Sequence, residues 1–108
     1  MRFVRPFHDL GKVRKGEQRQ MLFEFVNTGT ETLEIDLVSG CDCSIIDWPS
    51  GERFAPGEKG KIKVTFDSSR EDEFGKMTKT LDIILVNEDP KTGYPIIEEL
   101  KYRLELIR

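Results

Sequence analysis

Hydrophobic and polar residues alternate with a period of two along most of the chain. The clearest case is "GKIKVTFDS", in which Ile62, Val64 and Phe66 alternate with polar side chains. Because the side chains of a β-strand point alternately to two faces, this pattern predicts a strand with one buried face. The same alternation recurs in "QMLFEFV", "TLEIDLV", "KTLDIILV" and "IIEELKYRLELI".

Each of these stretches places a row of large apolar side chains on its inward face. The last stretch is also rich in Glu, Leu, Lys and Arg, which favour helices, but its strict alternation favours a strand. The predicted inward rows are Met21, Phe23 and Phe25; Leu33, Ile35 and Leu37; Leu81, Ile83 and Leu85; and Ile96, Leu100, Tyr102, Leu104 and Leu106.

Turn-forming residues separate the predicted strands. Gly, Pro, Asn, Asp and Ser are concentrated in "NTGTET", "PSGERFAPGEKG", "SREDEFG" and "NEDPKTGYP". A first strand near 3–13 and a short one near 44–48 bring the total to about seven. The chain therefore predicts an all-β, immunoglobulin-like β-sandwich of about seven antiparallel strands in two sheets. Its length predicts a single domain over 1–108.

Composition narrows the classes of partner. The 17 basic and 20 acidic residues are well mixed and give a net charge of -3, so no basic stripe is present to neutralise a nucleic-acid backbone. The longest apolar run, Ile83 to Val86, is far too short to span a membrane, and no signal-peptide pattern is present. We expect no nucleic-acid partner and no membrane-spanning segment.

Cys41 and Cys43 are the only cysteines and are one residue apart in "SGCDCS". In an extended strand their Cα atoms would be about 6.6 Å apart, so a disulfide requires a bend. As thiolates, the pair can bind a soft ion such as Cu(I) or cycle as a dithiol, but no second cysteine pair is present for structural zinc. The favoured interpretation is a strand corner in which the cysteines are small buried side chains, with Trp48 packed nearby.

Four aromatic residues fall in or beside the predicted loops: Trp48, Phe54, Phe74 and Tyr94. Loops commonly carry the recognition residues of a sandwich. Most such rings pack down as loop anchors, but rings that are exposed together would form a patch for a partner. These four are therefore the candidate partner-binding residues.

No catalytic constellation is evident. His8, beside Asp9, is the only histidine, and no Gly-x-Ser-x-Gly motif accompanies it, so we interpret it as a turn or strand-edge residue. "GERFAPGEKGK" lacks the spacing of a phosphate-binding loop, and "SREDEFG" lacks that of a calcium loop. The chain is predicted not to be an enzyme and to hold no cofactor.

Five blocks occur in a characteristic order: "FHDLGKV" (7–13), "FEFVNTG" (23–29), "SGCDCS" (39–44), "APGEKGKIKVTFD" (55–67) and "KMTKTLDIILVN" (76–87). In this order they resemble the DUF1573 family of bacterial proteins, although the family pattern has Cys-Gly-Cys-Thr where this chain has Cys41-Asp42-Cys43-Ser44. The resemblance implies a PapD-like or major-sperm-protein-like sandwich that acts as a binding module. It also implies a core over about 7–87, a closing strand over about 96–107, and a periplasmic or secreted location in the bacterial envelope.

The leading functional hypothesis is a non-catalytic interaction or structural module of a bacterial cell-envelope protein. Its unidentified partner is expected to be a protein, bound by end loops or by strand addition at an exposed sheet edge. The alternative is a thiol-based site in which Cys41 and Cys43 bind Cu(I) or cycle between dithiol and disulfide.

Overall fold

The computed structural model describes residues 1–108, and nearly all of its regular elements are β-strands. The strands are β1 (Arg2–Phe3), β2 (Phe7–Arg14), β3 (Gln18–Val26), β4 (Leu33–Ser39), β5 (Ser44–Asp47), β6 (Arg53–Phe54), β7 (Lys59–Asp67), β8 (Gly75–Glu88) and β9 (Pro95–Ile107). One turn of 3-10 helix, η1 (Ser68–Arg70), links β7 to β8. No helix in the structure is long and apolar enough to span a membrane.

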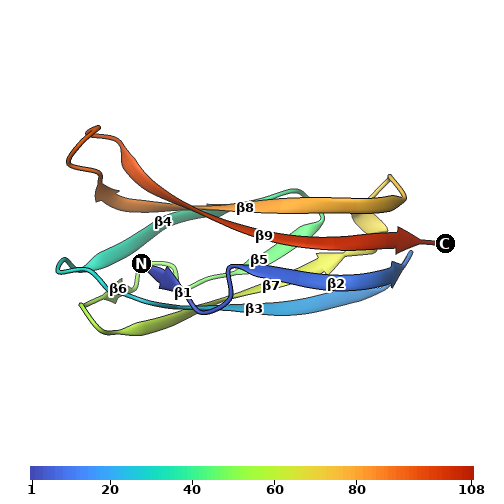
Figure 1. Cartoon of the computed structure of the whole chain (residues 1–108), viewed down its shortest axis with the longest axis horizontal. Coiled ribbons are helices and arrows are strands. Elements are labelled where there is room, and N and C mark those ends of the chain that lie inside the picture. Colours follow the sequence, from blue (N-terminus) through green and yellow to red (C-terminus); the bar gives the residue numbers. More distant parts are fainter.

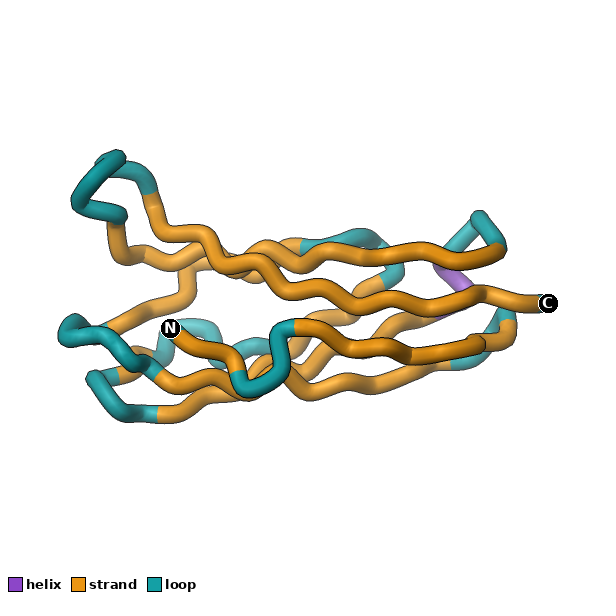
Figure 2. Tube along the Cα trace, in the orientation of Figure 1, coloured by secondary structure: helices purple, strands orange, loops and turns teal.

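The strands form two sheets that pack face to face (Figure 1). One sheet has the order β1-β3-β7-β5, and the other has the order β2-β9-β8-β4-β6. The molecule is elongated, 47 × 25 × 20 Å, and most loops gather at its two ends (Figure 2). The predicted immunoglobulin-like β-sandwich is confirmed, and the carboxy-terminal segment is a strand.

The prediction that all strands are antiparallel is wrong for one pair, because β2 runs parallel to β9. The predicted first strand is in fact two strands in different sheets. β1 pairs with β3, and Val4 N–H donates to Glu24 C=O; after Pro6, β2 joins the other sheet. Pro6 has no N–H, but its C=O accepts a hydrogen bond from Lys101 N–H at 3.1 Å. The chain thus crosses between the sheets within three residues.

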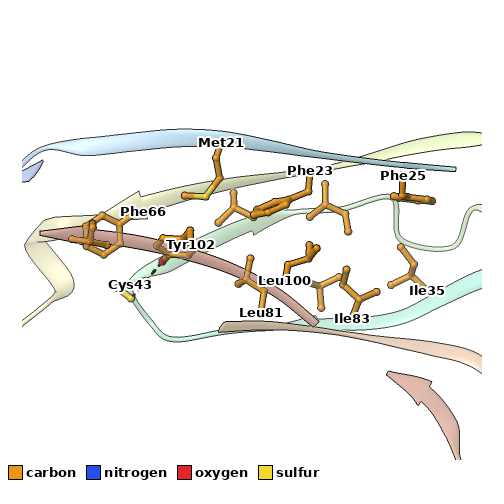
Figure 3. Close-up of a cluster of buried hydrophobic side chains, with 14 of the residues drawn as sticks. Met21, Phe23, Phe25, Ile35, Cys43, Phe66, Leu81, Ile83, Leu100 and Tyr102 are labelled. Atoms are coloured by element: carbon orange, nitrogen blue, oxygen red, sulfur yellow. Dashed lines mark hydrogen bonds between the residues drawn. The ribbon is translucent and has the colours of Figure 1, made fainter. Parts of the chain in front are cut away.

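Side chains from both inner faces interdigitate in one core of 19 buried hydrophobic residues (Figure 3). The predicted inward rows Ile62, Val64 and Phe66 and Leu81, Ile83 and Leu85 are at most 1% exposed. The row that ends β9 is buried as well, from Leu100 to Leu106. These faces remove most of the large apolar side chains from water, which is the main favourable contribution to folding.

The predicted inward row of β4 is correct for Leu33 and Ile35 and wrong for Leu37. The pairing of β4 with β8 shifts register between Ile35 and Leu37, which marks a β-bulge at Asp36. Because the extra residue reverses the alternation, Val38 is buried and Leu37 is 48% exposed.

Asn27, in the "NTG" block, has a structural role. Its side chain is buried and donates to the C=O groups of Phe54 and Glu31, at 2.8 and 2.7 Å. Its Oδ1 accepts from Gly29 N–H at 3.0 Å. The block therefore pins the β3–β4 loop to β6 and satisfies buried backbone groups.

Gly60 of β7 lies against the rings of Phe25 and Phe54. A Cβ at this position would overlap the Phe25 ring and lie 2.7 Å from Phe54 Cε1. We predict that Gly60→Ala lowers the free energy of unfolding by about 1–3 kcal/mol, because packed rings must move to admit the methyl group. Urea unfolding measures the change. Gly29→Ala is the control, since its Cβ would meet only Asn27 Oδ1, at 3.5 Å; equal losses in the two variants would contradict the prediction.

Candidate functional site

A groove of about 720 Å³ lies along β7 where β5 ends. One wall is β7 itself, with Lys59, Lys61 and Lys63. The other wall is the segment that leaves β5, with Trp48 and Pro49. We call this feature the edge groove. It forms where the chain, after leaving β5 and β6, returns along β7.

Backbone polar groups of β7 face the edge groove without a partner strand. Asp67 N–H donates to Cys43 C=O at 2.8 Å, so every second residue before Asp67 also directs its backbone groups toward β5. β5 ends at Asp47, opposite Lys63, which leaves the N–H and C=O of Lys61 facing the groove. The chain then turns away, and β6 pairs with β4 in the other sheet. The groove therefore contains a length of strand edge that is open to pairing.

Three lysines line the β7 side of the edge groove. Lys59, Lys61 and Lys63 project from the outer face of β7, while Ile62 between them is buried in the core. They are about 6.6 Å apart along the strand, as alternate residues of any strand are. All three are exposed, and none forms an ion pair with a carboxylate.

The opposite wall carries an aromatic ring and two carboxylates. Trp48 is half-buried and packs against the core, so its indole is held in place while part of it still faces the groove. Asp47 and Glu52 also line the groove, which therefore has three positive and two negative side chains. The positive and negative side chains lie on opposite walls, and the positive ones belong to β7, the strand with the open edge.

A second exposed feature is a row of aliphatic side chains across the outer face of the five-stranded sheet. Leu37, Ile84 and Ile97 are direct neighbours on β4, β8 and β9. Leu37 and Ile97 are 48% and 60% exposed. At this level the sheet is only three strands wide, because β6 pairs with the start of β4 and β2 with the second half of β9. The row therefore runs between two incomplete sheet edges.

Cys41 and Cys43 form a disulfide at the corner between β4 and β5, with their Cα atoms 5.1 Å apart. A turn closed by Ser44 N–H donating to Cys41 C=O at 3.0 Å brings them closer than an extended strand would. Cys43 is buried, and its Sγ lies 4.0 Å from the Tyr102 hydroxyl (Figure 3). That hydroxyl also bonds Ser44 Oγ at 2.6 Å. The corner is thus bent as a disulfide requires, and it is anchored in the core.

The four candidate aromatic residues do not form one patch. Phe54 is buried and packs edge-on against Phe25, with ring centroids 5.0 Å apart, as a loop anchor does. Phe74 and Tyr94 are exposed, but they flank opposite ends of the long strand β8. Trp48 and Phe54 both line the edge groove, but Phe54 is almost fully buried, whereas Trp48 is half-buried. Partner binding by Trp48, Phe54, Phe74 and Tyr94 stays a prediction.

His8 lies on β2, at the edge of the five-stranded sheet. Its Nε2 is 3.1 Å from Leu22 C=O, and its ring packs edge-on against Phe23 with centroids 4.7 Å apart. No nucleophile contacts the ring. His8 therefore bridges β2 and β3 across the open side of the sandwich.

Burial of the ring lowers the pKa of His8, the hydrogen bond to Leu22 partly opposes this, and the charge of Arg5 lowers the pKa further. Because the pKa is lower in the folded state than in the unfolded state, protonation favours unfolding, and stability falls as the pH drops through the ordinary histidine range. We predict that the native His8 pKa measured by NMR is lower than the value in urea. We also predict that His8→Gln flattens the loss of stability between about pH 7 and pH 5. A native pKa at or above the unfolded value would contradict both statements.

The two facing sheets define an immunoglobulin-like β-sandwich. Solved structures with this fold include a protein of unknown function from Porphyromonas gingivalis (TM-score 0.73, 19% identity, 94% of this chain and 44% of that chain). A PapD-like domain of human CEP192 is similar over 99% of this chain and 84% of that chain, with a TM-score of 0.65 and 13% identity. The periplasmic chaperone SfaE is similar over 99% of this chain and 59% of that chain, with a TM-score of 0.59 and 10% identity.

The chain belongs to the DUF1573 family, described as a protein of unknown function, whose model matches residues 1–98. No curated protein matches the chain by sequence. The chain spans less than two thirds of the length of the Porphyromonas gingivalis protein and of SfaE. The recognised sequence blocks are thus confirmed as those of this family, and the solved structures establish the fold.

Proposed function

We propose that this domain is a non-catalytic protein-binding module that adds an extended segment of its partner as a strand to β7. The observation that carries the proposal is the edge groove, where β5 stops and the backbone N–H and C=O of Lys61 face outward without a partner. An unpaired strand edge is a template for a further strand: main-chain hydrogen bonds supply affinity, and flanking side chains supply specificity.

The β7 edge suits strand addition better than the other incomplete edges. Between β2 and β3, His8 binds Leu22 C=O and Arg19 Nη2 donates to Lys12 C=O at 3.3 Å, so side chains bridge that gap. The free part of β4 contains the bulge at Asp36, which disrupts regular pairing. The β7 edge has neither obstacle, and it is flanked by a groove.

Three observations support a location in the bacterial envelope. The family resemblance implies an envelope protein, and SfaE, which shares the fold, is a periplasmic chaperone. The Cys41–Cys43 disulfide adds an independent argument, because disulfides persist in oxidising compartments such as the periplasm. A protein-binding domain with a disulfide-locked corner suits such a setting.

Lys61→Pro tests strand addition. The Lys61 N–H faces the groove unpaired, whereas its neighbours Gly60 and Ile62 direct their backbone groups to β3, so proline removes only the outward donor. Peptides selected on the wild-type domain from a random display library are predicted to bind the proline variant about tenfold more weakly, with unfolding midpoints that show both proteins folded.

Lys61→Ala is the matched control, because it removes the same charge and keeps the N–H. Affinity for the selected peptides should be at least several-fold higher in the alanine variant than in the proline variant. Equal affinities in the two variants would show that the main chain of β7 takes no part in binding and would overturn the proposal.

A second candidate function is a dithiol–disulfide couple at Cys41 and Cys43, favoured by the disulfide itself and by the partial exposure of Cys41. Reduction would convert the S–S bond to two thiols with two electrons and two protons from an external dithiol. Only this reduced form would offer the two thiolates that Cu(I) prefers. The buried position of Cys43 limits access to one side of the bond.

We predict that protein purified without reductant has no titratable thiol, either folded or unfolded. If the couple is functional, dithiothreitol releases two thiols from the folded protein, because a reductant can reach Cys41. A Cys41→Ser, Cys43→Ser variant controls for background reaction. Two thiols in freshly purified protein would contradict the disulfide, and thiols released only after denaturation would contradict the redox function.

A further inference from the structure

We infer that the strand accepted by the edge groove is acidic: an extended protein segment with Asp or Glu at every second position. This inference rests on the proposed strand addition and names its partner by chemistry. It is carried by Lys59 and Lys61, which lie beside the open edge of β7, and by Lys63, which borders that edge opposite Asp47.

The spacing of the lysines matches that of an added strand. Alternate residues of a strand are about 6.6 Å apart, in the partner as in β7. Because Asp47 of β5 already lies opposite Lys63, an added strand pairs with β7 at Lys61 and Lys59 and places every second side chain on the outer face next to these two lysines. Side chains that face each other across paired strands have Cβ atoms only about 4.5–5.5 Å apart, so carboxylates at those positions would reach the ammonium groups.

The lysines are available for such contacts. The three groove lysines form no ion pair with a carboxylate. Six other basic residues do: Arg19, Arg53, Arg70, Lys79, Lys101 and Arg103. The groove lysines form a local row of positive charge in a chain whose net charge is -3. Asp47 ends β5 opposite Lys63, so the carboxylates of the partner would continue along β7 a pattern that β5 begins.

Trp48 provides a direct signal of occupancy. It is the only tryptophan of the chain, it is half-buried, and it lines the wall that faces the lysine row. A strand in the groove would cover the exposed part of the indole and change its surroundings. Intrinsic fluorescence therefore reports whether the Trp48 wall of the edge groove is covered.

The test uses fluorescein-labelled ten-residue peptides in which Glu alternates with Thr, and the same peptides with Gln in place of Glu. Fluorescence anisotropy gives affinity, and the tryptophan emission of unlabelled mixtures gives the location. We expect the Glu peptide to bind about tenfold more tightly than the Gln peptide, since each exposed ion pair adds a modest amount. Added salt should reduce this difference, because the pairs lie at the surface.

A triple variant that combines Lys59→Gln, Lys61→Gln and Lys63→Gln should bind the Glu and Gln peptides with equal affinity. The matched control is Lys12→Gln, Lys76→Gln, Lys91→Gln, which removes the same charge from exposed lysines elsewhere and should keep the preference for Glu. Equal binding of both peptides, lost in Lys61→Pro, would overturn the acidic partner and leave strand addition standing. Glu-dependent binding that survives Lys61→Pro would support the acidic partner and refute strand addition. Absence of any peptide binding would overturn both.

Discussion

Mutual burial of two inner sheet faces is the constraint on which this structure depends. The side chains that fill the space between the sheets, such as Phe23, Phe66 and Leu81, are almost completely removed from water. Since side chains alternate between the faces of a strand, a slip of one residue would expose an entire buried row. The register of the long strands is therefore set by the core, and the outer faces and edges are free to vary.

The incomplete edges follow from how the chain moves between the two sheets. At Val4 to Pro6 and again at Trp48 to Glu52, the chain leaves one sheet for the other. Each crossing ends a short strand beside a longer one: β5 has four residues and β7 has nine. Natural proteins usually cover or disrupt such edges. Here the edge of β3 is bridged by His8 and Arg19 and the edge of β4 is bent by a bulge, whereas the edge of β7 is left open.

The sequence predicted the sandwich because alternation is a local property of each strand. It could not show the bulge at Asp36, since "LEIDLV" reads as regular until β4 is paired with β8. Nor could it show the parallel pairing of β2 with β9, which joins opposite ends of the chain. The alternating lysines of β7 were visible but indistinguishable from an ordinary solvated face. Phe54 looked like a loop aromatic, yet Gly60 leaves the space in which its ring packs. The groove depends on where β5 stops along β7, which pairing of the strands decides.

The disulfide corner and the edge groove are two ends of one short element. Cys43 C=O accepts the hydrogen bond from Asp67 N–H that begins the pairing of β5 with β7, and Cys41 C=O closes the turn just before it. The disulfide joins these two cysteines, so it restricts the conformations open to the start of β5. Because β5 continues for only four residues, the position of its start also sets where it stops and where the edge of β7 opens. The disulfide and the edge groove are therefore connected structurally through β5.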